Sequence, residues 1–127
     1  MLKYAYNPNP KKSVKVYGRN MRISTKHSVA VCRAITGTTL ARAKRLLQNI
    51  LDEKVSLDGK YYTSTVNEVM GLLNVAESNA ESKGLDTEKM VVHASAHRGF
   101  NYRTPRRFKL ARRTARMTNL QIVLEER

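Results

Sequence analysis

Residues 90–127 read MVVHASAHRGFNYRTPRRFKLARRTARMTNLQIVLEER, and this stretch decides the fold. Apolar residues recur at every second position near its start (Val92, Ala94, Ala96) and near its end (Leu120, Ile122, Leu124). A period of two is typical of β-strands that bury one face. The stretch therefore predicts two antiparallel strands joined by a long basic connection.

The connection itself, RGFNYRTPRRFKLARRTARMT, is too long for a tight turn and too basic for a protein core. It interleaves eight Lys and Arg residues with aromatic rings and contains no acid, which disfavours the alternative of a merely solvated loop. Guanidinium groups bind phosphate bidentately and stack on bases, so this mixture favours folded RNA. The candidate RNA-binding residues of the segment are Arg98, Arg103, Arg106, Arg107, Phe108, Lys109, Arg112, Arg113 and Arg116.

Before residue 90 the apolar spacing changes to that of amphipathic helices. Three are predicted: one that follows Ser24 or Thr25 and stops at Gly37, one from Thr38 or Thr39, and one from Thr63 or Ser64 to Gly84. A short strand is expected at residues 19–24. The fold class is thus α+β, with an Asp58-Gly59 turn between the second and third helices.

The 127 residues suit one domain and carry 24 Lys and Arg against 10 Asp and Glu, a formal charge of +14. Such a surface calls for a polyanion as partner. Residues 1–51 hold eleven of these bases and no acid, and Pro8 and Pro10 disfavour a helix near the start. We therefore expect a basic arm at residues 1–17 and a domain at 18–127, with Lys11, Lys12, Lys15, Arg19 and Arg22 as further RNA-binding candidates.

Other classes of function find little support in the sequence. No phosphate-binding glycine loop, nucleophile elbow or set of paired carboxylates occurs, so neither an enzyme nor a bound cofactor is expected. His93 and His97 lie on a predicted strand, where four residues span about 13 Å, so they cannot share a metal ion. Cys32 cannot form an intramolecular disulfide, and no long apolar run is present, so we expect a cytoplasmic protein without membrane contact.

Three stretches together resemble the universal large-subunit ribosomal protein numbered twenty-two in bacteria and seventeen in eukaryotes, especially its archaeal members. They are MRISTKHSVAVCRAITG (21–37), AESNAESKGLDTEKM (76–90), and VVHASAHR (91–98) followed by a Pro-Arg element and LQIVLEER (120–127). The positions that match the family pattern are Lys26, His27, Arg33, Gly37, Asn79, Ala80, Gly84, Asp86, Arg103, Pro105 and Arg106. Lys26, His27 and Arg33 thereby join the RNA-binding candidates.

The resemblance implies three helices packed on a small three-stranded antiparallel sheet, from which a long β-hairpin projects at about residues 97–117. It implies a structural constituent of the cytoplasmic large ribosomal subunit that binds its RNA and supports translation and subunit assembly. The hairpin tip would help form the wall of the nascent-peptide exit tunnel. Neighbouring ribosomal proteins and the nascent peptide are the other implied partners, and no self-association is expected.

Two departures from the family pattern affect the hairpin and the helices. The link KVSLDGKYY (54–62) is shorter than in archaeal and eukaryotic members, and Lys109 stands where the Pro-Arg element would place glycine. A DNA-compacting or regulatory protein is the alternative with the same charge, although such proteins usually present a recognition helix or a dimer interface. A basic RNA-modifying enzyme would need a cofactor loop or clustered titratable groups.

Overall fold

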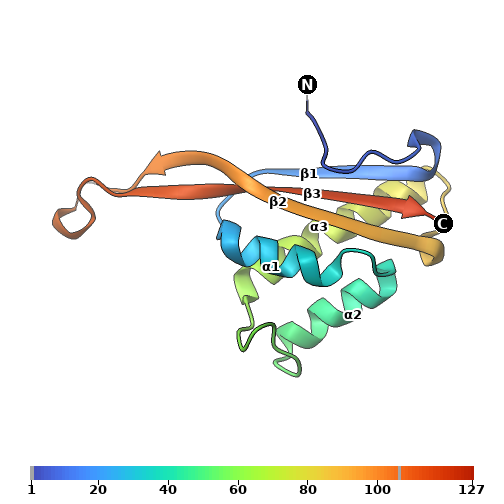
Figure 1. Cartoon of the computed structure of the whole chain (residues 1–127), viewed down its shortest axis with the longest axis horizontal. Coiled ribbons are helices and arrows are strands. Elements are labelled where there is room, and N and C mark those ends of the chain that lie inside the picture. Colours follow the sequence, from blue (N-terminus) through green and yellow to red (C-terminus); the bar gives the residue numbers. More distant parts are fainter. Residues whose placement is uncertain (1, 106) are drawn as a thin grey trace.

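A computed structural model describes residues 2–105 and 107–127. Within them lie the helices α1 (Thr25–Ile35), α2 (Leu40–Leu51) and α3 (Thr63–Ser82) and the strands β1 (Ser13–Met21), β2 (Met90–Arg103) and β3 (Thr114–Glu126). The strands form one antiparallel sheet in the order β1-β3-β2 (Figure 1). The predicted α+β class, with three helices and a three-stranded antiparallel sheet, is confirmed.

The sheet buries its helix-facing side through the period-two pattern. In β3, Leu120, Ile122 and Leu124 are fully buried and pair with Val16 and Val92 among their neighbours. Helix α3 supplies Val66, Val69 and Leu73, whereas α1 and α2 supply Val31, Ile35, Leu47 and Ile50, all fully buried. Burying one such side chain contributes about 1.5–3 kcal/mol relative to leaving it exposed, so this layer stabilises the domain.

The first strand begins earlier than the sequence analysis expected. It runs from Ser13 to Met21 rather than over residues 19–24, so the last five residues of the expected arm belong to the sheet. Val14 and Val16 face the helices at the required spacing, but Lys15 between them and Tyr17 after them gave the segment a basic, irregular character. Pairing with β3 outweighs this weak local signal.

The opposite side of the sheet is covered by the arm rather than left in solvent. Gln121 binds the arm twice, because its Oε1 accepts from the Ala5 backbone N–H (3.0 Å) and its Nε2 donates to the Lys3 carbonyl (2.9 Å). The Tyr4 ring packs edge-on against Tyr17 at 6.2 Å. The segment is therefore a third layer, and Gln121 retains only 5% of its exposure beneath it.

Of the three helices, α1 has the side-chain cap that local chemistry predicts. Ser24 caps it by accepting from the His27 N–H, whereas α2 begins after Thr39 without a side-chain cap bond. Helix α3 lacks the predicted hydroxyl cap: it starts at Thr63 after Tyr62, which adopts a left-handed conformation (φ 42°) and packs its ring 4.6 Å from that of His27. The short link reverses direction at the predicted Asp58-Gly59 turn, where both residues have positive φ.

Strands β2 and β3 continue past the helices as a two-stranded hairpin (Figure 1), and paired bulges mark where it leaves. The register of β1 with β3 shifts between Gly18 and Met21, and that of β2 with β3 shifts between Arg98 and Asn101. Asn20 joins the two bulges: its N–H donates to Asn119 Oδ1 (2.8 Å) and its Oδ1 accepts from the Phe100 N–H (3.2 Å). We call this level the hairpin root.

Candidate nucleic-acid interface

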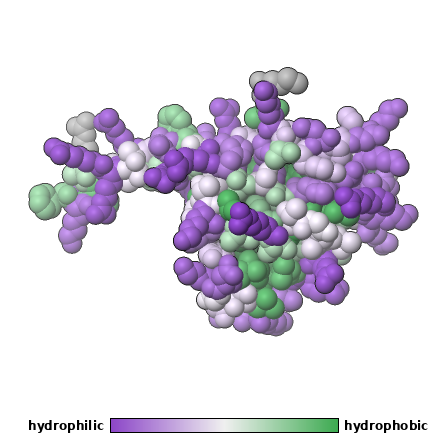
Figure 2. Space-filling model, viewed as in Figure 1, coloured by the Kyte–Doolittle hydropathy of each residue, from purple (hydrophilic) through white to green (hydrophobic). Residues whose placement is uncertain are grey.

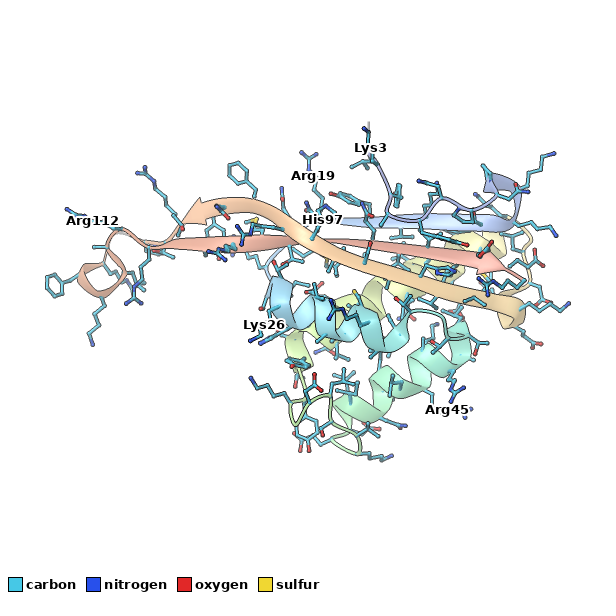
Figure 3. All side chains as sticks on the ribbon, viewed as in Figure 1. Lys3, Arg19, Lys26, Arg45, His97 and Arg112 are labelled. Carbon is cyan, nitrogen blue, oxygen red and sulfur yellow. The ribbon has the colours of Figure 1, made fainter. Side chains whose placement is uncertain are left out.

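The hairpin beyond the root carries predicted RNA-binding cations that are exposed to solvent. Arg98, Arg103, Arg107, Lys109, Arg112, Arg113 and Arg116 are all exposed. Hydrophilic side chains crowd this projecting ribbon in Figure 2, and Figure 3 places Arg112 near its far end. The paired strands extend from the Arg98–Thr118 pair to the Arg103–Thr114 pair, four residue steps in β3, or about 14 Å, before the connecting loop begins. The predicted Arg106 lies outside the described residues.

Two aromatic rings of the hairpin face solvent. Phe100 is 70% exposed and Phe108 is 99% exposed, values that no packing role within this chain explains. Tyr102 is half-buried because the Arg22 guanidinium lies over its ring at 5.6 Å. Exposed rings beside arginines are the groups on which unpaired bases stack in RNA complexes.

The loop at the hairpin tip is closed by its own hydrogen bonds. The Thr104 hydroxyl lies 3.1 Å from both the Leu110 and the Arg113 carbonyl oxygens, and the Leu110 N–H donates to the Arg107 carbonyl (2.9 Å). The left-handed residue of the turn is Arg112 (φ 62°) rather than Lys109. The loop thus makes its reversal three residues after the position where the family pattern has glycine.

The predicted cations outside the hairpin do not form one surface. Lys11 and Lys12 are exposed in a short 3-10 turn at the end of β1 away from the hairpin (Figure 1). Lys15 is half-buried and bound within the chain, since its Nζ donates to Asn7 Oδ1 (2.8 Å) and lies over the Tyr4 ring. In Figure 3, Arg19 points to the side of the sheet away from the helices, whereas Lys26 lies on the helix side.

Helix α1 carries three predicted residues, of which Lys26 lies at the root. Lys26 and Arg33 are exposed on α1 and border a hollow that Asp58 and Tyr62 of the link also line. The His27 ring is half-buried against Tyr62. The short link therefore closes against the start of α1, and of these three candidates Lys26 and Arg33 keep their charge available.

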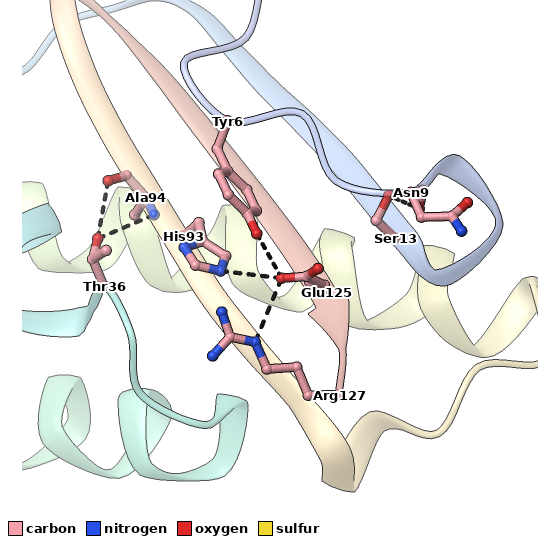
Figure 4. Close-up of polar contacts among 8 residues, drawn as sticks. All are labelled: Tyr6, Asn9, Ser13, Thr36, His93, Ala94, Glu125 and Arg127. Carbon is pink, nitrogen blue, oxygen red and sulfur yellow. Dashed lines mark hydrogen bonds and ion pairs between the residues drawn. The ribbon is translucent and has the colours of Figure 1, made fainter.

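A separate polar cluster fastens the arm near the ends of β2 and β3 (Figure 4). Tyr6 donates its hydroxyl proton to Glu125 Oε2 (2.8 Å) and stacks on His93 with 4.0 Å between ring centroids. That hydrogen bond is the main cause that lowers the pKa of Glu125, and it raises the pKa of Tyr6. His93 Nε2 lies 3.5 Å from the same carboxylate, and Arg127 Nε lies 3.6 Å from it.

The remaining titratable groups have structural surroundings. Burial raises the pKa of the Cys32 thiol to about 12, so this cysteine stays protonated as a core residue. Lys44 of α2 pairs with Glu77 of α3. Across residues 2–105 and 107–127, no group of three or more His, Cys, Asp or Glu gathers as a metal site. In the same ranges, no helix has the length and apolar character needed to cross a membrane.

Sequence reasoning missed the contacts that join distant segments. No local pattern marks Tyr4 or Tyr6 as residues that pack on the sheet. The one available signal was Gln121, a polar residue within an apolar strand, which indicates a hydrogen-bonding partner on that face of the sheet. The bulges were missed as well. Gly99 marks the second one, because a Cβ there would lie 3.0 Å from Asn20 Oδ1 and 3.1 Å from the Met117 carbonyl oxygen.

An α+β domain that extends a basic, aromatic-bearing ribbon is typical of structural proteins of ribonucleoprotein particles. The profile of the ribosomal protein L22p/L17e family matches residues 16–125, so the chain belongs to that family. It is therefore a protein of the large ribosomal subunit, in the cytoplasm, and not an enzyme.

Archaeal relatives agree with the predicted archaeal type. The chain is 33% identical to the large ribosomal subunit protein uL22 of Archaeoglobus fulgidus, with 99% of this chain and 97% of the relative covered. It is 29% identical to the uL22 of Methanococcus maripaludis, over 98% and 97% of the two chains. The uL22 of Methanopyrus kandleri is 31% identical over 91% and 88%.

Proposed function

We propose that this protein binds large-subunit ribosomal RNA through the hairpin and its root, and that the hairpin tip contributes to the wall of the nascent-peptide exit tunnel. The observation that carries the proposal is the ribbon itself. Two paired strands project beyond the helices, and within the described residues 98–105 and 107–116 they carry seven Lys and Arg, no acid and two solvent-facing phenylalanines.

Energetics support a partner for this ribbon. A two-stranded hairpin is at best marginally stable in water, and like charges along it repel one another. Contacts with RNA phosphates would remove that repulsion, and stacking on exposed rings adds about 1–3 kcal/mol per base. Dense RNA contacts therefore offset the ordering entropy that the ribbon cannot recover from the protein alone.

The globular domain and the projecting hairpin suggest separate roles. The helices build the core on one face of the sheet and the arm covers Gln121 on the other, so the core contains no residue of the hairpin beyond the root. The hairpin is then free to reach a site distant from the domain and to contact the nascent peptide at its tip. Lys11 and Lys12, at the other end of the sheet, would bind separate RNA, while neighbouring ribosomal proteins contact the remaining surface. In this way the protein supports subunit assembly and translation.

Sedimentation in the native cell tests the proposal. A tagged copy should travel with the large subunit through a sucrose gradient, remain there after a high-salt wash, and be released by nuclease. Release by salt alone would indicate a peripheral association. A copy that follows DNA or stays at the top of the gradient would overturn the RNA-binding proposal and favour nucleic-acid compaction.

A further inference from the structure

Three cations from three different elements surround one hollow at the hairpin root. Lys26 belongs to the first turn of α1, Arg98 to β2 and Arg116 to β3. Together with Ser24 and Thr25 they line a space of about 340 Å³. Figure 3 shows Lys26 on the helix side, close to where the hairpin leaves the domain. No continuous stretch of sequence contains this set.

The pairing of β2 with β3 places the two arginines on the same side. Arg98 pairs with Thr118 before the bulge, and Asn101 pairs with Arg116 after it. Paired residues share a face of a sheet, and residues two apart in a strand do so as well. Arg98 and Arg116 therefore both point to the helix side, where Lys26 lies, because Arg98 pairs with Thr118 and Arg116 is two residues from Thr118 in β3.

Hydrogen bonds hold the floor of the hollow in place. The buried Thr118 hydroxyl donates to the Ile23 carbonyl (2.8 Å), so its oxygen is the acceptor of the Thr25 hydroxyl proton at 2.8 Å. These two bonds tie the start of α1 to β3. The Ser24 oxygen accepts the capping bond from His27, which leaves its hydroxyl proton available on the rim.

The electrostatics of the hollow favour an anion. Among the described residues, no carboxylate oxygen lies within 4.0 Å of Lys26, Arg98 or Arg116, and no acid lines the space. Three like charges held around one hollow repel one another in the free protein. An anion with several acceptor oxygens satisfies two guanidinium forks and one ammonium at once, which a single carboxylate does less well.

We propose that this hollow is a socket for one phosphate of the RNA backbone, and that the occupied socket sets the direction in which the hairpin enters the RNA. The inference rests on the RNA-binding function proposed above and deepens it. Side chains fixed to α1, β2 and β3 bind the same phosphate, so the domain and the base of the hairpin are held to one point of the RNA. The lining donates hydrogen bonds without reading a base edge, so the socket recognises position rather than sequence.

Phosphate-ethylation interference tests the socket. Large-subunit RNA from the source cell is lightly ethylated with ethylnitrosourea, bound to the full-length protein, and separated into bound and free fractions. The variants are Lys26→Gln, Arg98→Gln and Arg116→Gln, with Arg45→Gln on α2 as the matched control. All four replace exposed cations, and circular dichroism checks that each variant is folded.

Interference at one shared phosphate should weaken in all three socket variants and stay unchanged in the Arg45→Gln control. Each single loss should weaken binding about tenfold, which is typical for one charged hydrogen bond. The triple variant should lose less than the product of the three, because its members share one partner. The charge-preserving Lys26→Arg should keep the phosphate in the pattern.

Loss of three different phosphates, or of none, overturns the socket while leaving RNA binding intact. Failure of the unaltered protein to bind large-subunit RNA would instead remove the proposed function, and the socket with it.

Discussion

Replacing Thr118 by valine should loosen the joint between α1 and β3. Valine keeps the shape of the side chain but removes the hydroxyl that donates to the Ile23 carbonyl and accepts from Thr25. Thr118 is fully buried and Ile23 is 8% exposed, so water cannot readily replace the missing partner. A buried polar group left without a partner costs about 1–3 kcal/mol, and the half-buried Thr25 hydroxyl loses a bond of about 1 kcal/mol, so we expect a total near 2–3 kcal/mol.

That loss is a large part of the roughly 5–15 kcal/mol by which domains of this size are stable. With a denaturant slope of about 2 kcal/mol per molar urea, the unfolding midpoint should fall by about 1–1.5 M. Far-UV circular dichroism during urea titration measures it. Thr114→Val, at an exposed site in the same strand, is the matched control and should stay within about 0.5 kcal/mol of the unaltered protein. Equal midpoints for the two variants would refute the reasoning.

Three further predictions address the root, the arm and the tip. Gly99→Ala should lower the thermal midpoint because its Cβ would lie 3.1 Å from the Met117 carbonyl oxygen. Gly71→Ala in α3, whose Cβ would have nothing within 4 Å, should raise the free energy of unfolding by up to about 1 kcal/mol. Equal shifts of the two variants in calorimetry would contradict this. The pKa of Glu125 is lower in the folded protein than in the unfolded chain, where it is 4.5. The ionised carboxylate therefore stabilises the docked arm fully at pH values above 4.5, and this contribution disappears as the pH falls through the folded pKa. Tyr6→Phe should move the Glu125 pKa upward in an NMR titration, and an unmoved pKa would show that the hydrogen bond is not the cause. Replacing four tip arginines (Arg106, Arg107, Arg112 and Arg113) by glutamine should weaken RNA binding and flatten its dependence on salt concentration. The logarithmic slope should fall by about one for each phosphate that the variant no longer binds. The helical circular-dichroism signal should stay unchanged, and a reduced signal would mean that the tip supports the fold.

Sequence periodicity predicted the elements whose signal is local. The helices and the strands β2 and β3 follow from apolar spacing, and Ser24 was recognisable as a cap. The predicted position of β1 was wrong because Val14 and Val16 are separated by a lysine, which binds Asn7 of the arm in the fold. The predicted hydroxyl cap of α3 was wrong because the helix follows Tyr62, a left-handed residue whose ring packs against His27, and apolar spacing does not report on either feature.

The candidate interface divides in the same way. Charge and composition identified the hairpin cations, since they are adjacent in sequence. Sequence could not reveal that Lys15 donates a hydrogen bond to Asn7 of the arm. Nor could it reveal that Lys26, Arg98 and Arg116 line one hollow, because that depends on how β2 and β3 pair and on where α1 packs. A bulge shifts the register of β2 and β3 by one residue, and no composition rule reports on it.

The strand order β1-β3-β2 has a consequence for how the chain folds during synthesis. The central strand is the latest of the three in sequence, so neither edge strand has a partner until β3 has been made. Contacts such as that between Ala5 and Gln121, 116 residues apart, raise the contact order and slow the search for the sheet. Until then, the strand edges and basic segments remain open to aggregation or to wrong RNA, a period in which a chaperone or an assembly factor would have the most to protect.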